Sequence, residues 1–98
     1  MFALKLTPRA EADLVRIWLY TFDMWGAEQA DGYVDQIEES LKHLLIHPSL
    51  GADYSHIRPA YRRLRIEQHD VFYTVGTNEL LIVRVLHEDM DAPRRLLD

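Results

Sequence analysis

The sequence predicts an α+β fold in which an α-helical hairpin packs on one face of a mainly antiparallel four-stranded sheet. Two long segments near the N-terminus have helical periodicity, and three shorter segments rich in β-branched and aromatic residues follow them, with turn residues in between. A short strand precedes the helices, so the predicted order is βααβββ. The length of 98 residues suits one core, and residues 1–98 are predicted to form one domain.

The first helix is predicted from a capping signal followed by apolar periodicity. A strand over Phe2–Leu6 leads to Thr7 and Pro8, which suit the N-cap and first turn of a helix that ends near Trp25. Its narrow polar side is predicted to comprise Asp13, Arg16, Tyr20 and Asp23. Its apolar arc, roughly 200° wide, exceeds the usual core stripe, so part of it is expected to stay open. That part is predicted to be a partner-binding groove formed by Val15, Trp18, Leu19 and Phe22.

A second helix follows almost without a connection. Gly26 interrupts the first pattern, and the second helix is predicted from Ala27 to His47, where Pro48 ends it. Its core-facing stripe, about 120° wide, has helical spacing. This stripe consists of Ala30, Tyr33, Val34, Ile37, Leu41, Leu44 and Leu45. Two helices joined so tightly form an antiparallel hairpin.

Three strands complete the predicted sheet, over Tyr61–Glu67, Asp70–Val75 and Glu79–His87. Gln68-His69 is predicted as a turn, and Pro93 as the start of one last helical turn. The last strand is apolar on both faces, and successive side chains of a strand alternate between faces. Its helix-facing side is predicted to hold Leu81, Val83 and Val85. A chain this short is expected to leave the other side open for a partner, and that side holds Leu80, Ile82, Arg84 and Leu86.

Composition narrows the classes of function. The net charge of −5 argues against attraction to nucleic acid over the whole surface, although seven arginines fall within residues 58–98. The absence of cysteine suits a reducing cytoplasm. The N-terminal segment is too short for a signal peptide, and no apolar run approaches the roughly 20 residues of a membrane span. A cytoplasmic protein without a membrane segment is predicted.

Clustered basic side chains are the most suggestive candidates for binding. Arginines on an open sheet face suit phosphates or carboxylates, but they equally suit ion pairs with local acids such as Glu67. His87, beside Glu88 and Asp89, is a candidate for proton transfer or simply ends its strand. The sequence has no glycine-rich phosphate loop, nucleophile elbow or H-E-x-x-H motif. No cofactor, metal site or catalytic residue is therefore predicted.

Short motifs in a fixed order cover nearly the whole chain. They include Leu6-Thr7-Pro8-Arg9-Ala10-Glu11-Ala12-Asp13-Leu14, Trp25-Gly26-x-x-Gln29-Ala30-x-x-Tyr33, His47-Pro48-x-x-Gly51, Ile57-Arg58-Pro59-x-x-Arg62-Arg63 and Arg84-Val85-Leu86-His87-x-x-Met90-Asp91-x-x-Arg94. Together they resemble the ParE branch of the ParE/RelE toxin superfamily. The resemblance implies a type II toxin–antitoxin toxin with the βααβββ fold. It further implies a hetero-oligomer with a ParD-like antitoxin, through which alone the toxin would reach DNA.

The two branches of the superfamily imply different activities. ParE-like toxins inhibit DNA gyrase, whereas RelE-like toxins are ribosome-dependent mRNA endoribonucleases. The nuclease branch usually has an aromatic or histidine pair after the last strand. Here Glu88 and Asp89 follow His87, no tyrosine occurs after Tyr73, and two carboxylates would repel an RNA phosphate. Gyrase inhibition by binding, without catalysis, is therefore favoured. The alternatives are the RelE-like nuclease and an inactive relative that binds its antitoxin alone.

The contact surface predicted for the target and partner lies on the open sheet face and the C-terminal segment. It consists of Arg63, Arg65, Leu80, Ile82, Arg84, Leu86, His87, Met90 and Arg94.

Overall fold

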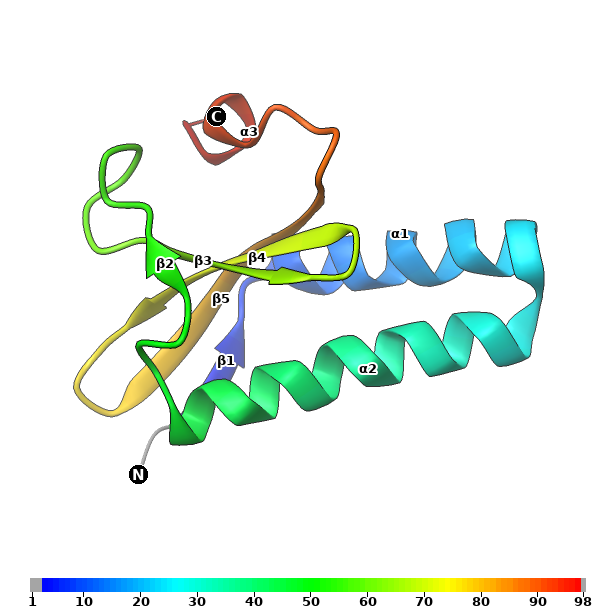
Figure 1. Cartoon of the computed structure of the whole chain (residues 1–98), viewed down its shortest axis with the longest axis horizontal. Coiled ribbons are helices and arrows are strands. Elements are labelled where there is room, and N and C mark those ends of the chain that lie inside the picture. Colours follow the sequence, from blue (N-terminus) through cyan, green and yellow to red (C-terminus); the bar gives the residue numbers. More distant parts are fainter. Residues whose placement is uncertain (1–2, 98) are drawn as a thin grey trace.

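A helical hairpin covers one face of a five-stranded sheet in the computed structural model, which describes residues 3–97 (Figure 1). The strand order is β1-β5-β4-β3-β2, with β1 parallel to β5 and the other neighbours antiparallel. The elements are β1 (Ala3–Leu6), α1 (Pro8–Trp25), α2 (Ala27–Ile46), β2 (Ala52–Asp53), β3 (Arg62–Ile66), β4 (His69–Val75), β5 (Glu79–His87) and α3 (Ala92–Leu97).

The predicted α+β architecture is confirmed, with small differences. The sheet gains a strand because β2 adds two residues beside β3. Strand β4 begins at His69, which was predicted to lie in a turn. The predicted last turn of helix is present as α3. Phe2, predicted in the first strand, lies outside the described residues.

Thr7, which lies between β1 and α1, connects the start of the first helix to the last strand through hydrogen bonds. Its hydroxyl oxygen accepts the Ala10 N–H at 3.0 Å, which is the expected N-cap bond. The same hydroxyl donates to the Val83 carbonyl at 2.7 Å, and the Thr7 N–H donates to the Ile82 carbonyl at 3.0 Å. Because of these bonds, α1 starts against the middle of β5 and its first turns run along that strand.

A β-bulge in β5 changes the predicted alternation of its side chains. Across the β4–β5 pair, Phe72 lies opposite Arg84 and Tyr73 lies opposite Ile82, so Val83 has no partner residue. Leu80 and Ile82 face the helices before the bulge, and Val85 faces them after it. The prediction that Leu81 and Val83 face the helices is therefore wrong, and it is right for Val85.

The main core lies between the helical hairpin and the sheet. The predicted stripe of α2 is confirmed, since Ala30, Ile37, Leu41 and Leu44 are buried and the rest of the stripe is partly buried. Ile17 of α1 enters the same core. Each large apolar side chain buried in this way contributes roughly 1.5–3 kcal/mol.

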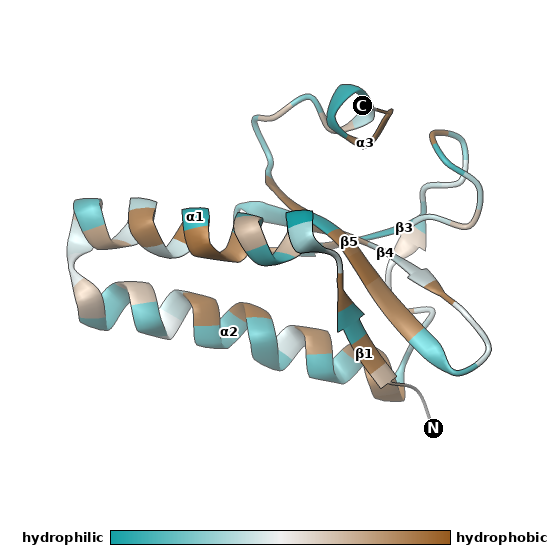
Figure 2. Cartoon of the chain, turned by 180° about the vertical axis from the view of Figure 1, so that it is seen from behind, coloured by the Kyte–Doolittle hydropathy of each residue, from teal (hydrophilic) through white to brown (hydrophobic). Residues whose placement is uncertain are grey.

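The hairpin is longer than the sheet that it covers, and its tip projects past the sheet edge (Figure 1). Burial in α1 ends at Thr21, and burial in α2 begins at Ala30. Viewed from the other side, apolar residues recur along α1 (Figure 2). Within residues 3–97, no helix combines the length and apolar character needed to cross a membrane.

Gly51 lets the loop after α2 pass over a buried tyrosine. The Gly51 N–H donates to the Tyr73 hydroxyl at 2.8 Å, and that hydroxyl donates to the Pro48 carbonyl at 2.8 Å. A Cβ at position 51 would lie 2.6 Å from the Tyr73 oxygen and 3.0 Å from the Arg63 carbonyl. We expect Gly51→Ala to lower the free energy of unfolding by about 1–3 kcal/mol, measured by urea denaturation.

Gly32→Ala is the matched control for this substitution. Gly32 lies within α2, and a Cβ there would meet no atom within 4 Å. Alanine should raise stability by about 0.5–1 kcal/mol at such a position. Equal destabilisation by both substitutions would contradict the proposed clash at Gly51.

Candidate partner-binding surfaces

The second face of the sheet, opposite the helical hairpin, is covered at its centre by the chain itself. There Phe72, Leu86 and Leu96 of α3 form a second buried cluster. The partly buried residues that pack against it are Tyr54, Ile57, Tyr61 and Ala92. Figure 1 shows α3 on the side of the sheet away from the hairpin. The prediction that β5 leaves one face open for a partner is therefore wrong.

The predicted apolar contact residues of β5 are buried. Leu80 and Ile82 lie in the core under the helices, and Leu86 lies under α3. The prediction of an open face assumed that the C-terminal tail and the loop before β3 are polar connections that cover nothing. In the structure these two segments form the third layer that a chain of this length seemed unable to supply.

Arg84 is also internal rather than on an open surface. Arg84 is only 9% exposed and Asp13 only 3% exposed, and their side chains form a bidentate ion pair. Arg84 Nε donates to Asp13 Oδ2 at 2.8 Å, and the second Arg84 nitrogen donates to Oδ1 at 3.0 Å. The expectation that Asp13 belongs to the polar side of α1 is wrong as well.

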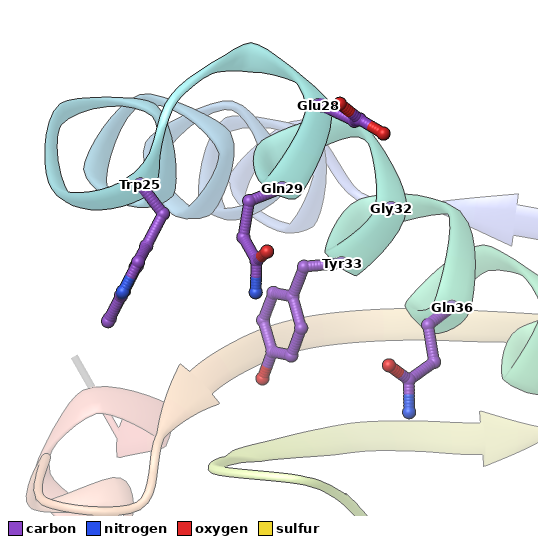
Figure 3. Close-up of a pocket in the computed structure, with 6 residues that line it drawn as sticks. All are labelled: Trp25, Glu28, Gln29, Gly32, Tyr33 and Gln36. Carbon is purple, nitrogen blue, oxygen red and sulfur yellow. The ribbon is translucent and has the colours of Figure 1, made fainter.

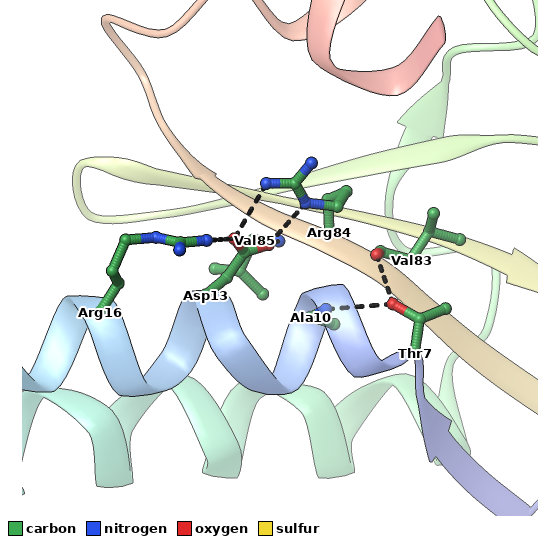
Figure 4. A network of polar contacts seen from close by, with 7 residues as sticks. All are labelled: Thr7, Ala10, Asp13, Arg16, Val83, Arg84 and Val85. Atoms are coloured by element: carbon green, nitrogen blue, oxygen red, sulfur yellow. Dashed lines mark hydrogen bonds and ion pairs between the residues drawn. The ribbon is translucent and has the colours of Figure 1, made fainter. Parts of the chain in front are cut away.

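Two further donors complete the shell of Asp13 (Figure 4). The Val85 N–H donates to Oδ2 at 2.9 Å, and Arg16 donates to Oδ1 at 2.7 Å. Burial acts to raise the pKa of Asp13, but the hydrogen bonds from Arg84, Val85 and Arg16 outweigh it and hold that pKa below its usual value. The hydrogen bond to Asp13 likewise raises the pKa of Arg84. The network fastens α1 to β5, and it occupies the Nε and one terminal nitrogen of Arg84 inside the chain.

The two predicted arginines of β3 also contact residues of this chain. Arg65 Nε donates to Asp70 Oδ1 at 2.6 Å, and Arg65 binds Glu88 at 2.9 Å through another nitrogen. The guanidinium of Arg63 lies 5.7 Å from the centre of the Tyr54 ring. The alternative of ion pairs with local acids holds for Arg65, although its acids are Asp70 and Glu88 rather than Glu67, whereas Arg63 lies over an aromatic ring.

The C-terminal residues of the predicted surface remain accessible. His87 is half-buried at the end of β5, and its Nδ1 accepts the Asp89 N–H at 3.1 Å. Met90 and Arg94 are exposed. His87 ends β5, Met90 lies in the connection that follows, and Arg94 lies in α3, so a smaller surface than predicted remains accessible there.

The outer side of α1 carries an exposed apolar stripe. Val15, Leu19 and Phe22 are 60%, 51% and 44% exposed, and they follow the i, i+4, i+7 spacing of one helix face. Trp18 stacks on Phe22 with ring centres 5.1 Å apart, and its indole N–H donates to Asp31 of α2 at 2.8 Å. These four residues are the ones predicted to stay open, and we call them the α1 stripe.

A family model described as "ParE toxin of type II toxin-antitoxin system, parDE" matches residues 4–92. The chain belongs to the ParE toxin family. It is 39% identical to Toxin ParE1 of Mycobacterium tuberculosis over 92 residues, which cover 93% of this chain and 94% of that toxin. It is 40% identical to Toxin ParE of Escherichia coli over 99 residues, which cover 100% of this chain and 96% of that one. The resemblance read from the motifs is confirmed.

Solved structures agree with this assignment. The ParE-type toxin superposes on a chain of the chromosomal ParDE system from P. aeruginosa with a TM-score of 0.79 and 30% identity, covering 89% of this chain and 96% of that chain. A chain of the YoeB-YefM complex from Staphylococcus aureus shares the fold, with a TM-score of 0.58 and 21% identity over 89% of this chain and 97% of that chain.

One cluster of this ParE-type toxin was missed from the sequence. The Tyr33 hydroxyl lies 2.6 Å from His69 Nδ1, and the His69 ring lies 5.2 Å from the His87 ring. Tyr33 had been assigned to the core stripe of the second helix and His69 to a turn. The turn between β3 and β4 consists of residues 67 and 68, so His69 is the first residue of β4. A two-residue turn at this point was the signal in the sequence that could have placed His69 in the sheet.

Proposed function

We propose that this ParE-type toxin is neutralised by a ParD-like antitoxin and inhibits DNA gyrase by binding, without bond-making chemistry of its own. The observation that carries the proposal is the match to ParE toxins over residues 4–92. Gyrase is the target that the ParE resemblance implies. It acts in the cytoplasm, where the toxin would meet it, and the toxin would reach operator DNA only through the antitoxin.

The arginine contacts favour a binding toxin over the RelE-like nuclease. Catalysis of RNA cleavage needs cations that are free to hold a developing phosphate charge. Arg84 is bound to Asp13, and Arg65 is bound to Asp70 and Glu88. The carboxylate of Glu88, next to His87, adds negative charge where an RNA phosphate would lie.

Purified toxin added to gyrase supercoiling reactions, in parallel with translation in a cell extract, tests this target. We expect supercoiling to stop while translation continues. Arg94→Glu should weaken gyrase inhibition several-fold by reversing charge on the accessible C-terminal segment, whereas Lys42→Glu on α2 serves as the matched control and should not. Translation arrest with intact supercoiling would instead indicate the nuclease. No growth arrest on expression would indicate an inactive relative.

The α1 stripe is the surface that we propose for the antitoxin. An amphipathic helix could lay its apolar side along Val15, Trp18, Leu19 and Phe22, as in helix-in-groove recognition. Leu19→Glu would place a charge at the centre of this contact. We expect it to weaken antitoxin binding by about 100-fold, measured by calorimetry with the antitoxin encoded beside the toxin.

Ile46→Glu is the matched control for this interface. Ile46 is also an exposed apolar residue of the hairpin, but it lies at the far end of α2. Its substitution should leave the affinity unchanged. If Leu19→Glu and Ile46→Glu weakened binding equally, the α1 stripe would not be the antitoxin surface.

A further inference from the structure

A cavity opens under the projecting tip of the helical hairpin. Its volume is about 590 Å³, within the range of ligand sites in proteins. We call it the hairpin pocket, and it is lined by Trp25, Glu28, Gln29, Gly32, Tyr33 and Gln36. Figure 3 shows four of these side chains projecting from the hairpin on one side, toward the sheet, while Glu28 lies at the rim and points away.

Two aromatic side chains project into the hairpin pocket, and they differ in exposure and in hydrogen bonding. Trp25 is 63% exposed, although tryptophan is usually buried or covered by a partner. The ring of Tyr33 is held in place because its hydroxyl bonds His69 Nδ1 at 2.6 Å and accepts the Gln68 N–H. The pocket therefore presents one fixed and one accessible aromatic face.

The hairpin around the pocket is strongly acidic. Residues 17–41 contain no lysine or arginine, and one carboxylate of this stretch, Glu28, lines the pocket. Glu67, in the turn between β3 and β4, accepts the Gln36 amide at 3.0 Å, and Glu88 follows the end of β5. Burial raises the pKa of Tyr33, a hydrogen bond from Gln68 opposes this, and the charges of Glu67 and Glu88 raise it further. The nearby cation Arg65 is already paired with Asp70 and Glu88.

We propose that the hairpin pocket receives an arginine side chain from a basic segment of a protein partner. A guanidinium is planar, so it can stack on the Trp25 or Tyr33 ring while it donates to the amide oxygens of Gln29 and Gln36. Glu28 in the lining and Glu67 beside Gln36 favour a cation and repel the phosphates of a nucleic acid. The site is separate from the α1 stripe, and it does not depend on gyrase being the target.

Nuclear magnetic resonance of the ¹⁵N-labelled full chain tests the proposal with a defined probe. The probe is the peptide acetyl-Gly-Arg-Gly-amide, and the comparison peptide carries citrulline, which has nearly the shape of arginine without its charge. We expect the arginine peptide to shift the Trp25 indole N–H saturably at millimolar concentration. The citrulline peptide should bind at least tenfold more weakly.

Variants locate the binding within the chain. Trp25→Ala should abolish the shifts at residues 29–36, and Glu67→Gln should weaken binding several-fold. Leu19→Ala is the matched control, because it removes an exposed apolar side chain on the α1 stripe, and it should leave the affinity unchanged. The proposal is overturned if no saturable shift occurs, if citrulline binds as well as arginine, or if Trp25→Ala binds as tightly as the unaltered chain. Gyrase assays do not enter this test, so its failure and that of the gyrase proposal are distinguishable.

Discussion

Replacing Asp13 by alanine is expected to lower the free energy of unfolding by about 3–5 kcal/mol, which is the usual effect of removing one partner from a buried ion pair. Arg84 would remain only 9% exposed with no counter-charge, and the Val85 N–H would lose its acceptor. Urea denaturation at neutral pH, followed by tryptophan fluorescence, measures this loss. It would remove a large part of the stability of a typical small domain.

Two further variants separate burial of a charge from loss of a contact. Arg16 also bonds Asp13, but its side chain is 63% exposed, so Arg16→Ala should cost at most about 1 kcal/mol. The double variant Asp13→Leu with Arg84→Met should recover much of the stability, because apolar side chains of similar volume often replace a buried ion pair without loss. Equal effects of Asp13→Ala and Arg16→Ala would contradict the account of Asp13 as the centre of the network.

The pH dependence of this pair has a definite direction. The pKa of Asp13 is lower in the folded chain than its usual value of 3.8, so the stabilisation is complete above that value. It is lost as the pH falls through the lower, folded pKa. Acid therefore weakens the α1–β5 attachment only in strongly acidic solution.

Local signals in the sequence predicted most of the fold. Thr7 and Pro8 marked the start of α1, Gly26 and Pro48 bounded α2, and helical spacing selected the buried stripe of α2. Each of these signals acts through the backbone within a few residues. Prediction therefore succeeded for the elements, for their order and for the hairpin.

The side-chain directions in β5 depended on contacts between distant segments. Its residues are apolar on both faces, so the sequence pattern holds no indication of which face meets the helices. The bulge at Val83 then reverses the alternation, and the Thr7 hydroxyl bonded to the Val83 carbonyl is 76 positions away in the chain. The pair of Asp13 with Arg84 joins the same two elements, α1 and β5, across 71 positions of the chain. The open, arginine-bearing face was inferred without these contacts.

Of the candidate binding surfaces, the α1 stripe was predicted best, because it depends on one helix alone. The α1 stripe follows from periodicity and from a surplus of apolar residues that one core cannot bury. The hairpin pocket needs the tip of the hairpin to extend past the sheet, which depends on the relative lengths of two elements. Neither Trp25 nor Tyr33 differs in sequence from an ordinary core aromatic residue, so periodicity placed both in the core.

Acidification from pH 6.5 to pH 4 is expected to lower the free energy of unfolding by roughly 3 kcal/mol through His69 alone, since each pH unit contributes about 1.4 kcal/mol. Burial, and after it the nearby His87, lowers the pKa of His69 from 6.5 to about 4. Between these values the unfolded chain binds a proton at His69 and the folded chain does not. Stability therefore falls as the pH falls, and the contribution of His69 is constant below about pH 4.

His69→Asn tests this expectation because asparagine can place an acceptor near the position of Nδ1, opposite the Tyr33 hydroxyl. Urea denaturation at several pH values should show a shallower loss of stability for this variant over the same interval. Ile66→Val is the control: Ile66 pairs with His69 across the β3–β4 turn, and the change should cost about 0.5–1.5 kcal/mol at every pH without altering the slope. If His69→Asn lost stability as steeply as the unaltered chain, other groups would account for the sensitivity to acid. The half-buried imidazole of His69, between Tyr33 of α2 and His87 of β5, would then play no part in it.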